Sequence, residues 1–205
     1  MDYRIEQFIN GPAGHHPALD ACMRDAATWA VPAFIGIVAA WFMFGWIRGL
    51  AAERRGALTA LFAAGGALLA NQIVLMFWQR PRPFDAHPGS VTTLVSRGAD
   101  PSFPSDHAAA AVAIAVVLFL AHRRIGAAVL VLAALVCLAR VYVGAHYPGD
   151  VLGGALVGAG VAALLWWPLA PLMARVARAV DWVIARLHLP LPDRSVPALS
   201  GGSGA

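Results

Sequence analysis

Five long apolar runs, separated by short arginine-bearing segments, limit the folds open to this chain more than any other feature. The runs cover residues 27–49, 57–78, 104–121, 125–143 and 151–173. A helix needs about 20 residues to cross the hydrocarbon layer of a bilayer, and each run is close to that length. Of the 205 residues, 60% are hydrophobic and only 13% are charged, which fits a membrane protein better than a soluble domain. We therefore predict an all-α fold, a polytopic membrane bundle of about five transmembrane helices.

Arginines set the expected orientation. The net charge of +4 includes 15 basic residues, all arginine, and they separate the apolar runs instead of forming the patch of a nucleic-acid-binding protein. Three clusters fall on one side of a five-helix topology: Arg48, Arg54 and Arg55; Arg123 and Arg124; and Arg175, Arg178 and Arg186. The positive-inside rule makes that side cytoplasmic. We expect a multi-pass protein of the bacterial cytoplasmic membrane, with its N-terminus outside and its C-terminus in the cytoplasm.

The apolar runs also divide the chain into four regions. Residues 1–26 are predicted to form an interfacial segment at the outer surface, and residues 27–173 the transmembrane domain. Residues 174–199 are expected to form a cytoplasmic amphipathic tail, because arginines occur there among Val, Trp and Leu. Residues 200–205 contain only Gly, Ser and Ala and resemble a flexible tail or a linker remnant.

Two ionisable residues are predicted to meet at one depth in the membrane. The third and fourth runs reach a full span only by extending through His107 and Arg140. His107 precedes Arg123 by 16 residues, and Arg140 follows Arg124 by 16. Both should therefore stand roughly 24 Å above the turn that joins the two helices. Ionisable groups at this depth usually face a cavity with a function.

Polar segments at the outer ends of the runs carry phosphate-binding chemistry. Alternate prolines hold the segment from Arg80 to Arg82 extended, and the planar forks of its arginines suit phosphate oxygens. The next segment begins a helix at Ser105 and Asp106, whose free N–H groups form an anion site beneath His107. Taken singly, the first segment also fits a helix end in contact with lipid headgroups, and the second fits an ordinary helix cap.

The third segment combines a cation, an imidazole and a carboxylate. Arg140 is followed by His146 and then by Asp150. Asp150 is placed to accept the proton of one ring nitrogen, which leaves the other nitrogen free to attack phosphorus. A second interpretation makes His107, His146 and Asp150 metal ligands. The neighbouring arginines would repel a divalent cation, so we expect neither a metal nor a cofactor.

In combination these segments resemble the type 2 phosphatidic acid phosphatase (PAP2) superfamily, which also includes the vanadium haloperoxidases. That family carries Lys, six residues and Arg-Pro; then Pro-Ser-Gly-His; then Ser-Arg, five residues, His, three residues and Asp. The chain is most similar to the bacitracin-resistance type of undecaprenyl pyrophosphate phosphatase. It shares Arg-Pro-Arg-Pro-Phe at 80–84 and Asp-Pro-Ser-Phe-Pro-Ser-Asp-His at 100–107. The resemblance covers most of residues 1–170.

The resemblance implies a role for each matching residue. His146 would be the nucleophile that forms a phosphohistidine, Asp150 would orient it, and His107 would protonate the leaving oxygen and then help to activate water. Arg82, Arg140 and the backbone at Ser105 and Asp106 would hold the phosphoryl oxygens. It also implies that no metal is required.

Three positions depart from the family pattern. Leu75 stands at the lysine position, Asp106 at the glycine position and Ala139 at the serine position of the third motif. Asp106 is normal for the bacitracin-resistance group. Loss of a charge-stabilising donor at Leu75 costs about 3 kcal/mol, or a hundredfold in rate, unless another cation replaces it. We predict that Arg80 is that cation; the alternative is that the site works with fewer charges, or works poorly.

The predicted function is hydrolysis of undecaprenyl or another polyprenyl pyrophosphate to the monophosphate on the extracytoplasmic face. Such an enzyme would recycle the carrier lipid of cell-wall synthesis and confer bacitracin resistance. Its partners are then the lipid pyrophosphate and the bilayer. One alternative is a phosphatase for phosphatidylglycerophosphate, phosphatidic acid or a lipid A phosphate. The other, suggested by Leu75, is a catalytically weak lipid-phosphate binder or transporter.

Overall fold

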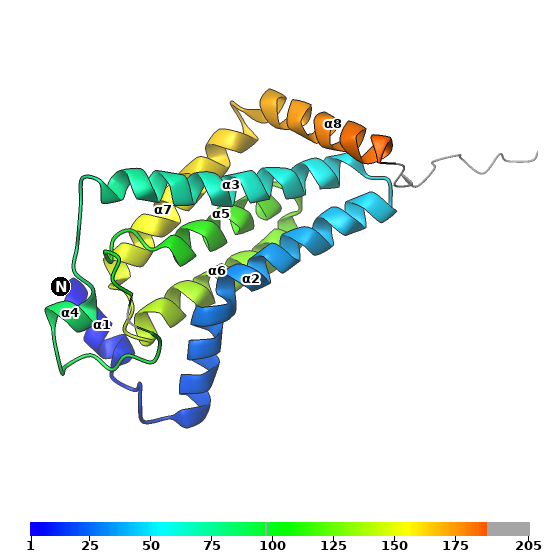
Figure 1. Ribbon diagram of the computed structural model, residues 1–205. Coiled ribbons are helices and arrows are strands. Elements are labelled where there is room, and N and C mark those ends of the chain that lie inside the picture. The colour runs from blue at the N-terminus through cyan, green and yellow to red at the C-terminus, as the bar shows by residue number, and fades with distance from the viewer. Residues whose placement is uncertain (97, 188–205) are drawn as a thin grey trace, which may run out of the picture.

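The computed structural model describes residues 1–96 and 98–187, and all regular structure in that part of the chain is helical (Figure 1). The helices are α1 (Asp2–Asn10), α2 (Pro17–Ile47), α3 (Ala51–Leu75), α4 (Pro83–Ala86), α5 (Asp106–Ala121), α6 (Arg123–Tyr142), α7 (Pro148–Trp166) and α8 (Ala170–Arg186). The all-α prediction is confirmed. Residues 188–199 of the predicted tail and the segment 200–205 lie outside the described residues.

Four of these helices, α2, α3, α6 and α7, are long and apolar enough to cross a membrane. Helix α5 is equally apolar but has only 16 residues, which is about 24 Å at 1.5 Å per residue. It lies in the middle of the bundle and packs against α2, α3, α6 and α7. The predicted polytopic bundle is therefore confirmed, with a short central helix surrounded by longer ones.

Small residues let α7 approach α5 closely. A side chain at Gly154 would collide with the Ser105 carbonyl, and one at Gly158 would collide with the Ala109 carbonyl. This spacing of small residues is a common way for membrane helices to bring their backbones together. At the end of the contact the Ser105 N–H donates to the Asp150 carbonyl oxygen at 3.0 Å. The close packing thus brings the first turns of α5 and α7 together.

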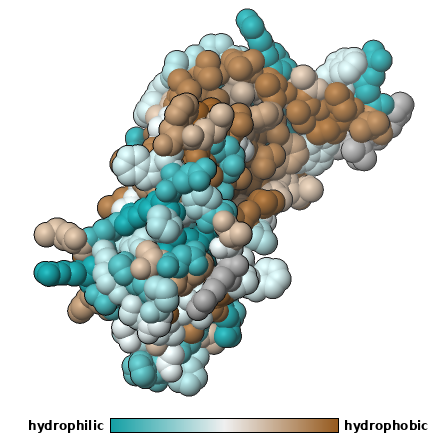
Figure 2. Space-filling model, turned by 60° about the vertical axis from the view of Figure 1, so that its left-hand side comes forward, coloured by the Kyte–Doolittle hydropathy of each residue, from teal (hydrophilic) through white to brown (hydrophobic). Residues whose placement is uncertain are grey.

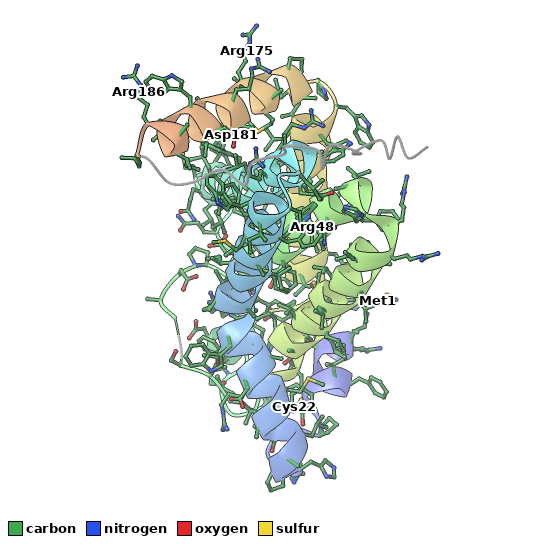
Figure 3. All side chains as sticks on the ribbon, turned by 90° about the vertical axis from the view of Figure 1, so that its right-hand side faces the viewer. Met1, Cys22, Arg48, Arg175, Asp181 and Arg186 are labelled. Atoms are coloured by element: carbon green, nitrogen blue, oxygen red, sulfur yellow. The ribbon has the colours of Figure 1, made fainter. Side chains whose placement is uncertain are left out.

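The two ends of the bundle differ in character. One end carries α1, α4 and the loops between α3 and α5, and it is hydrophilic beside a hydrophobic flank (Figures 1 and 2). The other end carries α8, where Arg175 and Arg186 lie far from Cys22 (Figure 3).

Helix α8 is held to α3 by a forked ion pair, because Arg54 donates to both carboxylate oxygens of Asp181 at 2.9 and 2.8 Å.

Prolines explain where the helices depart from the predicted runs. Helix α2 begins at Pro17, well before residue 27, and it bends near Pro32, which cannot donate a hydrogen bond within the helix (Figure 1). The last run was expected to continue to residue 173, but α7 ends at Trp166. Pro168 has no N–H to continue the hydrogen bonds of α7, so the helix stops before it and Ala170 begins a separate helix.

Helix α1 turns its polar face inward. Glu6 and Asn10 are buried, whereas Ile5 and Phe8 are 45% and 83% exposed. The Asn10 amide donates to the carbonyls of Thr92 at 2.8 Å and Tyr142 at 2.7 Å, which fixes the end of α1 to α6. The outward apolar residues agree with an interfacial segment, but the inward face shows that α1 is also docked on the bundle.

Replacement of Gly158 by alanine should destabilise the bundle, because the added methyl group collides with the backbone of α5. Overpacking of this kind costs about 1–3 kcal/mol. Gly160 is the matched control, since nothing lies within 4 Å of a side chain added there. Thermal unfolding in detergent should give a lower midpoint for Gly158→Ala and an equal or higher midpoint for Gly160→Ala. Equal effects of the two changes would contradict the close packing.

The buried carboxyl group of Glu6 should make the docking of α1 sensitive to pH. Burial raises its pKa from 4.5 to about 7, and neither carboxylate oxygen has a hydrogen-bond partner among the described residues. The pKa of Glu6 is higher in the folded than in the unfolded state. Its contribution to folding stability is therefore complete below pH 4.5 and is lost as the pH rises through about 7. Glu6→Gln should reduce the difference in unfolding midpoint between pH 5 and pH 8. The exposed carboxylate change Asp25→Asn should leave that difference unaltered.

Candidate active site

A polar cavity of about 290 Å³ lies at the hydrophilic end of the bundle. Five of the predicted site residues line it: Arg82, Asp106, His107, Arg140 and His146. They come from the segment before α4, the first turn of α5, the last turn of α6 and the loop before α7. His107 and Arg140 do meet at one depth, as their equal distances from the α5–α6 turn predicted.

His146 is held as a neutral imidazole. Its ring is 3% exposed, and its Nδ1 lies 2.8 Å from the Ser102 carbonyl oxygen. A carbonyl can only accept, so Nδ1 carries the proton and Nε2 keeps its lone pair. Burial first, and then the positive charges of Arg140 and Arg82, hold the pKa of His146 well below its usual range. The unprotonated Nε2 lies 3.4 Å from Nη1 of Arg82 in the cavity wall.

Arg82 is buried and aimed by backbone groups. Its Nε donates to the Asp100 carbonyl and its Nη1 to the Ala145 carbonyl, both at 2.9 Å. Its Nη2 lies 2.6 Å from the Asp100 carboxylate, which also lines the cavity. The Asp100 side chain is 64% exposed. An incoming phosphate therefore meets a fixed guanidinium whose Nη2 is paired with an exposed carboxylate.

Arg140 has donors to spare. It is 8% exposed, and its hydrogen bond from Nη1 to the Ala27 carbonyl is a long one, 3.4 Å. Its Nε is buried without a partner in the described part of the chain. Buried guanidinium donors of this kind are costly unless an acceptor reaches them. Arg140 lines the polar cavity, so a phosphate there would meet this guanidinium.

Asp106 is tied to α3. Its Oδ1 accepts a hydrogen bond of 2.7 Å from the side chain of Asn71, which is fully buried. The next residue, His107, lines the polar cavity and also a second, apolar cavity. His107 therefore stands at the boundary between a charged compartment and an apolar one.

The apolar cavity has a volume of about 420 Å³ and lies among α2, α3 and α5. Its walls are hydrophobic side chains and glycines, including Phe34, Leu61, Phe62 and Ile114. Cavities that bind ligands usually combine such walls with a few polar groups at one place. Here the polar groups line the neighbouring polar cavity, which shares His107 with the apolar one. A ligand could therefore place an apolar chain in one cavity and a charged group in the other.

The expected contact between Asp150 and His146 is indirect. Oδ2 of Asp150 is 4.0 Å from Nδ1 of His146 and instead accepts from Ser102 Oγ at 2.5 Å and from the Tyr147 N–H at 2.9 Å. The direct acceptor of the His146 proton is the Ser102 carbonyl. Asp150 is fully buried outside the cavity wall, so it is not placed to share a metal ion with His107 and His146.

Two further expectations are wrong in their details. Arg80 does not line the polar cavity; it pairs with Asp2 and Asp150, each at 2.8 Å, behind the histidine. The N–H of Ser105 donates to the Asp150 carbonyl, and its hydroxyl is buried without a partner among the described residues; Ser105 does not line the polar cavity, so it does not meet a phosphate there. In each case the predicted phosphate donor, the Arg80 guanidinium or the Ser105 N–H, is instead bonded to a carboxylate or carbonyl that is close in space but far in sequence.

Leu75 does line the polar cavity, as its place in the motif suggested. Within the described residues the cavity wall then holds two arginines, Arg82 and Arg140, and no third cation. Since Arg80 points elsewhere, nothing in the wall replaces the missing lysine.

Sequence reasoning missed Ser102, Asp100, Asn71 and Asp2 as members of this region. Asn71 is a polar residue within an apolar run, four positions before Leu75, and that placement is a usable signal. Ser102 and Asp100 lie in a loop without periodicity, and Asp2 lies in another helix. Only the fold brings these three to the site.

Comparisons with known proteins agree with this geometry. Residues 56–172 match the PAP2 superfamily. Undecaprenyl-diphosphatase BcrC of Bacillus subtilis (strain 168) is 33% identical over 186 residues, which cover 88% of this chain and 93% of that protein. The bacitracin transport permease protein BcrC of Bacillus licheniformis is 34% identical over 122 residues, 60% of each chain. A crystal structure of LpxE from Aquifex aeolicus has a TM-score of 0.66 and 25% identity, and covers 80% of this chain and 93% of that one.

Proposed function

The chain belongs to the PAP2 superfamily and is a membrane lipid phosphatase; from that premise we propose that it hydrolyses undecaprenyl pyrophosphate, or a related polyprenyl pyrophosphate, to the monophosphate. One observation carries the proposal. The unprotonated Nε2 of His146 faces a cavity walled by Arg82 and Arg140, and this cavity meets an apolar one at His107. The similarity to an undecaprenyl-diphosphatase supports the choice of substrate.

In the first step, Nε2 of His146 attacks the terminal phosphorus, and the bond from that phosphorus to the bridging oxygen breaks. His107 donates its proton to the bridging oxygen, which leaves with the lipid monophosphate. Arg82 and Arg140 hold the equatorial oxygens of the loose transition state, where positioning and charge stabilisation dominate. The product of this step is a phosphohistidine.

In the second step, a water molecule attacks the phosphohistidine and the N–P bond breaks. His107, now neutral, accepts the proton from that water, and Nε2 of His146 recovers its lone pair. Inorganic phosphate then leaves the arginines. The carboxylate of Asp100, which lies 2.6 Å from Arg82, is placed to replace it.

The proposed location is the extracytoplasmic face of the bacterial cytoplasmic membrane. Exposed arginines of α8 gather at the end of the bundle opposite the cavity, and the positive-inside rule assigns such an end to the cytoplasm. The N-terminal segment and the site would then face outward, and α8 would lie on the inner surface. An enzyme there recycles the carrier lipid of cell-wall synthesis.

A panel of lipids tests the substrate. The purified protein should hydrolyse undecaprenyl pyrophosphate with a kcat/KM at least about tenfold above those for phosphatidic acid, phosphatidylglycerophosphate and a lipid A phosphate. Release of inorganic phosphate in detergent micelles is the measurement. Preference for a glycerolipid would reject the polyprenyl substrate while keeping the phosphatase. Tight lipid binding without turnover would favour the binder or transporter.

Removal of the two histidines tests the mechanism. His146→Ala should lower kcat by about a thousandfold or more, because no nucleophile remains. His107→Ala should accumulate phosphoenzyme, since water attack loses its base. Acid-labile label from substrate carrying ³²P on the terminal phosphate measures that species. His15→Ala, an exposed histidine change, should behave as the unaltered protein. Full activity of His146→Ala would end the nucleophile assignment.

A further inference from the structure

The carboxylate of Asp2, at the start of α1, reaches the base of the active site from outside the bundle. Its Oδ1 accepts from the Gly149 N–H at 2.9 Å, and its Oδ2 accepts from Nη1 of Arg80 at 2.8 Å. Gly149 lies in the first turn of α7, directly before Asp150. The first residues of the chain are therefore fastened to the turn that carries this aspartate.

Arg80 continues the connection inward. The same Nη1 donates to Oδ1 of Asp150 at 2.8 Å, and the guanidinium lies 3.8 Å from the centre of the Tyr147 ring. Burial alone would lower the pKa of Arg80, but its hydrogen bonds and charge contacts with Asp2 and Asp150 raise it above its ordinary value. Arg80 is thus a permanent cation shared between one carboxylate from α1 and one from α7.

Asp150 is connected to His146 through Ser102. While Oδ1 is held by Arg80, Oδ2 accepts from Ser102 Oγ at 2.5 Å. The carbonyl of the same Ser102 accepts from Nδ1 of His146 at 2.8 Å. In this series the guanidinium and the hydroxyl donate to carboxylates, and the imidazole N–H donates to a carbonyl. The position of Asp2 therefore affects the orientation of the imidazole.

Arg80 is essential to this connection on energetic grounds. Asp150 is fully buried, and without Arg80 its charge would be met only by a hydroxyl and an N–H. Removing one partner of a buried ion pair leaves a charge that the surroundings cannot solvate. Asp150 would then turn toward water, and Ser102 would lose the acceptor that fixes it.

We propose that Asp2 and Arg80 are positioning residues for His146, which makes the N-terminal helix α1 part of the catalytic apparatus. The inference rests on the proposed role of His146 as nucleophile. Neither Asp2 nor Arg80 lines the polar cavity, so replacing them should slow the attack of His146 on phosphorus without weakening substrate binding. An imidazole displaced by about 1 Å loses up to a hundredfold in rate.

The experiment compares kcat and KM of the purified full chain on farnesyl pyrophosphate in detergent micelles. Arg80→Met should lower kcat by roughly 10- to 100-fold and Asp2→Ala by about tenfold, with KM changed less than about twofold. Arg80→Lys, which keeps one charge, should recover part of the loss. The controls are Arg4→Met on the exposed side of α1 and Asp85→Asn on α4, both expected to keep the original kcat.

A double variant separates positioning from general stability. If Asp2 acts through Arg80, Asp2→Ala combined with Arg80→Met should be no slower than Arg80→Met alone. Independent structural roles would instead multiply the two losses and lower the unfolding midpoint in proportion. Should Arg80→Met fail to fold, Arg80→Lys and Asp2→Asn give the same comparison with smaller effects.

Three outcomes would overturn the inference: a kcat for Arg80→Met within about twofold of the original, a loss confined to KM, or multiplicative losses in the double variant. The result for His146→Ala distinguishes this failure from a failure of the proposed function. If His146→Ala is active, both the proposed mechanism and the positioning role of Asp2 and Arg80 are rejected. An inactive His146→Ala together with fully active Asp2 and Arg80 variants removes only the role of α1.

Discussion

The need to partner buried charge at the end of an apolar bundle governs the arrangement of this site. Arg82, Arg140 and Asp150 are almost fully buried, where an unpaired ion costs several kcal/mol. Arg82 and Asp150 have neighbours that match their donors and acceptors. Arg140 does not, because its Nε has no partner among the described residues. Arg140 lines the polar cavity, so its guanidinium is the buried charge that a ligand in this cavity would neutralise.

The close approach of α5 and α7 makes this pairing possible. Glycines at 154 and 158 let the two backbones meet, so that the Ser105 N–H reaches the Asp150 carbonyl. Because this bond joins the first turns of both helices, the loops before them also converge. Ser102 precedes α5 and His146 precedes α7, and their hydrogen bond is a consequence of that convergence. The geometry of His146 thus depends on a contact that contains no polar side chain.

Sequence reasoning reached the elements with regular spacing and missed the contacts made by loops. Four of the five predicted spans follow from hydropathy, and the meeting of His107 and Arg140 at one cavity follows from helix rise; the fifth predicted span is the short helix α5 of 16 residues. The pairing of His146 with Asp150 follows less well, because Ser102 comes between them from a loop with no periodicity. Arg80 was misjudged because the alternate prolines predict only an extended segment whose arginines suit phosphate. They say nothing about Asp2, which binds it instead.

The absence of a lysine at position 75 acquires a physical meaning in this setting. In the described cavity wall the charges of Arg82 and Arg140 are balanced by the carboxylates of Asp100 and Asp106. An anion entering this wall gains most if it displaces the exposed Asp100 from Arg82, since Asp106 is fixed by Asn71. A highly charged pyrophosphate competes for that guanidinium better than a monophosphate does. Under the proposed function, this wall of two arginines would therefore hold the less charged inorganic phosphate less tightly than the pyrophosphate substrate.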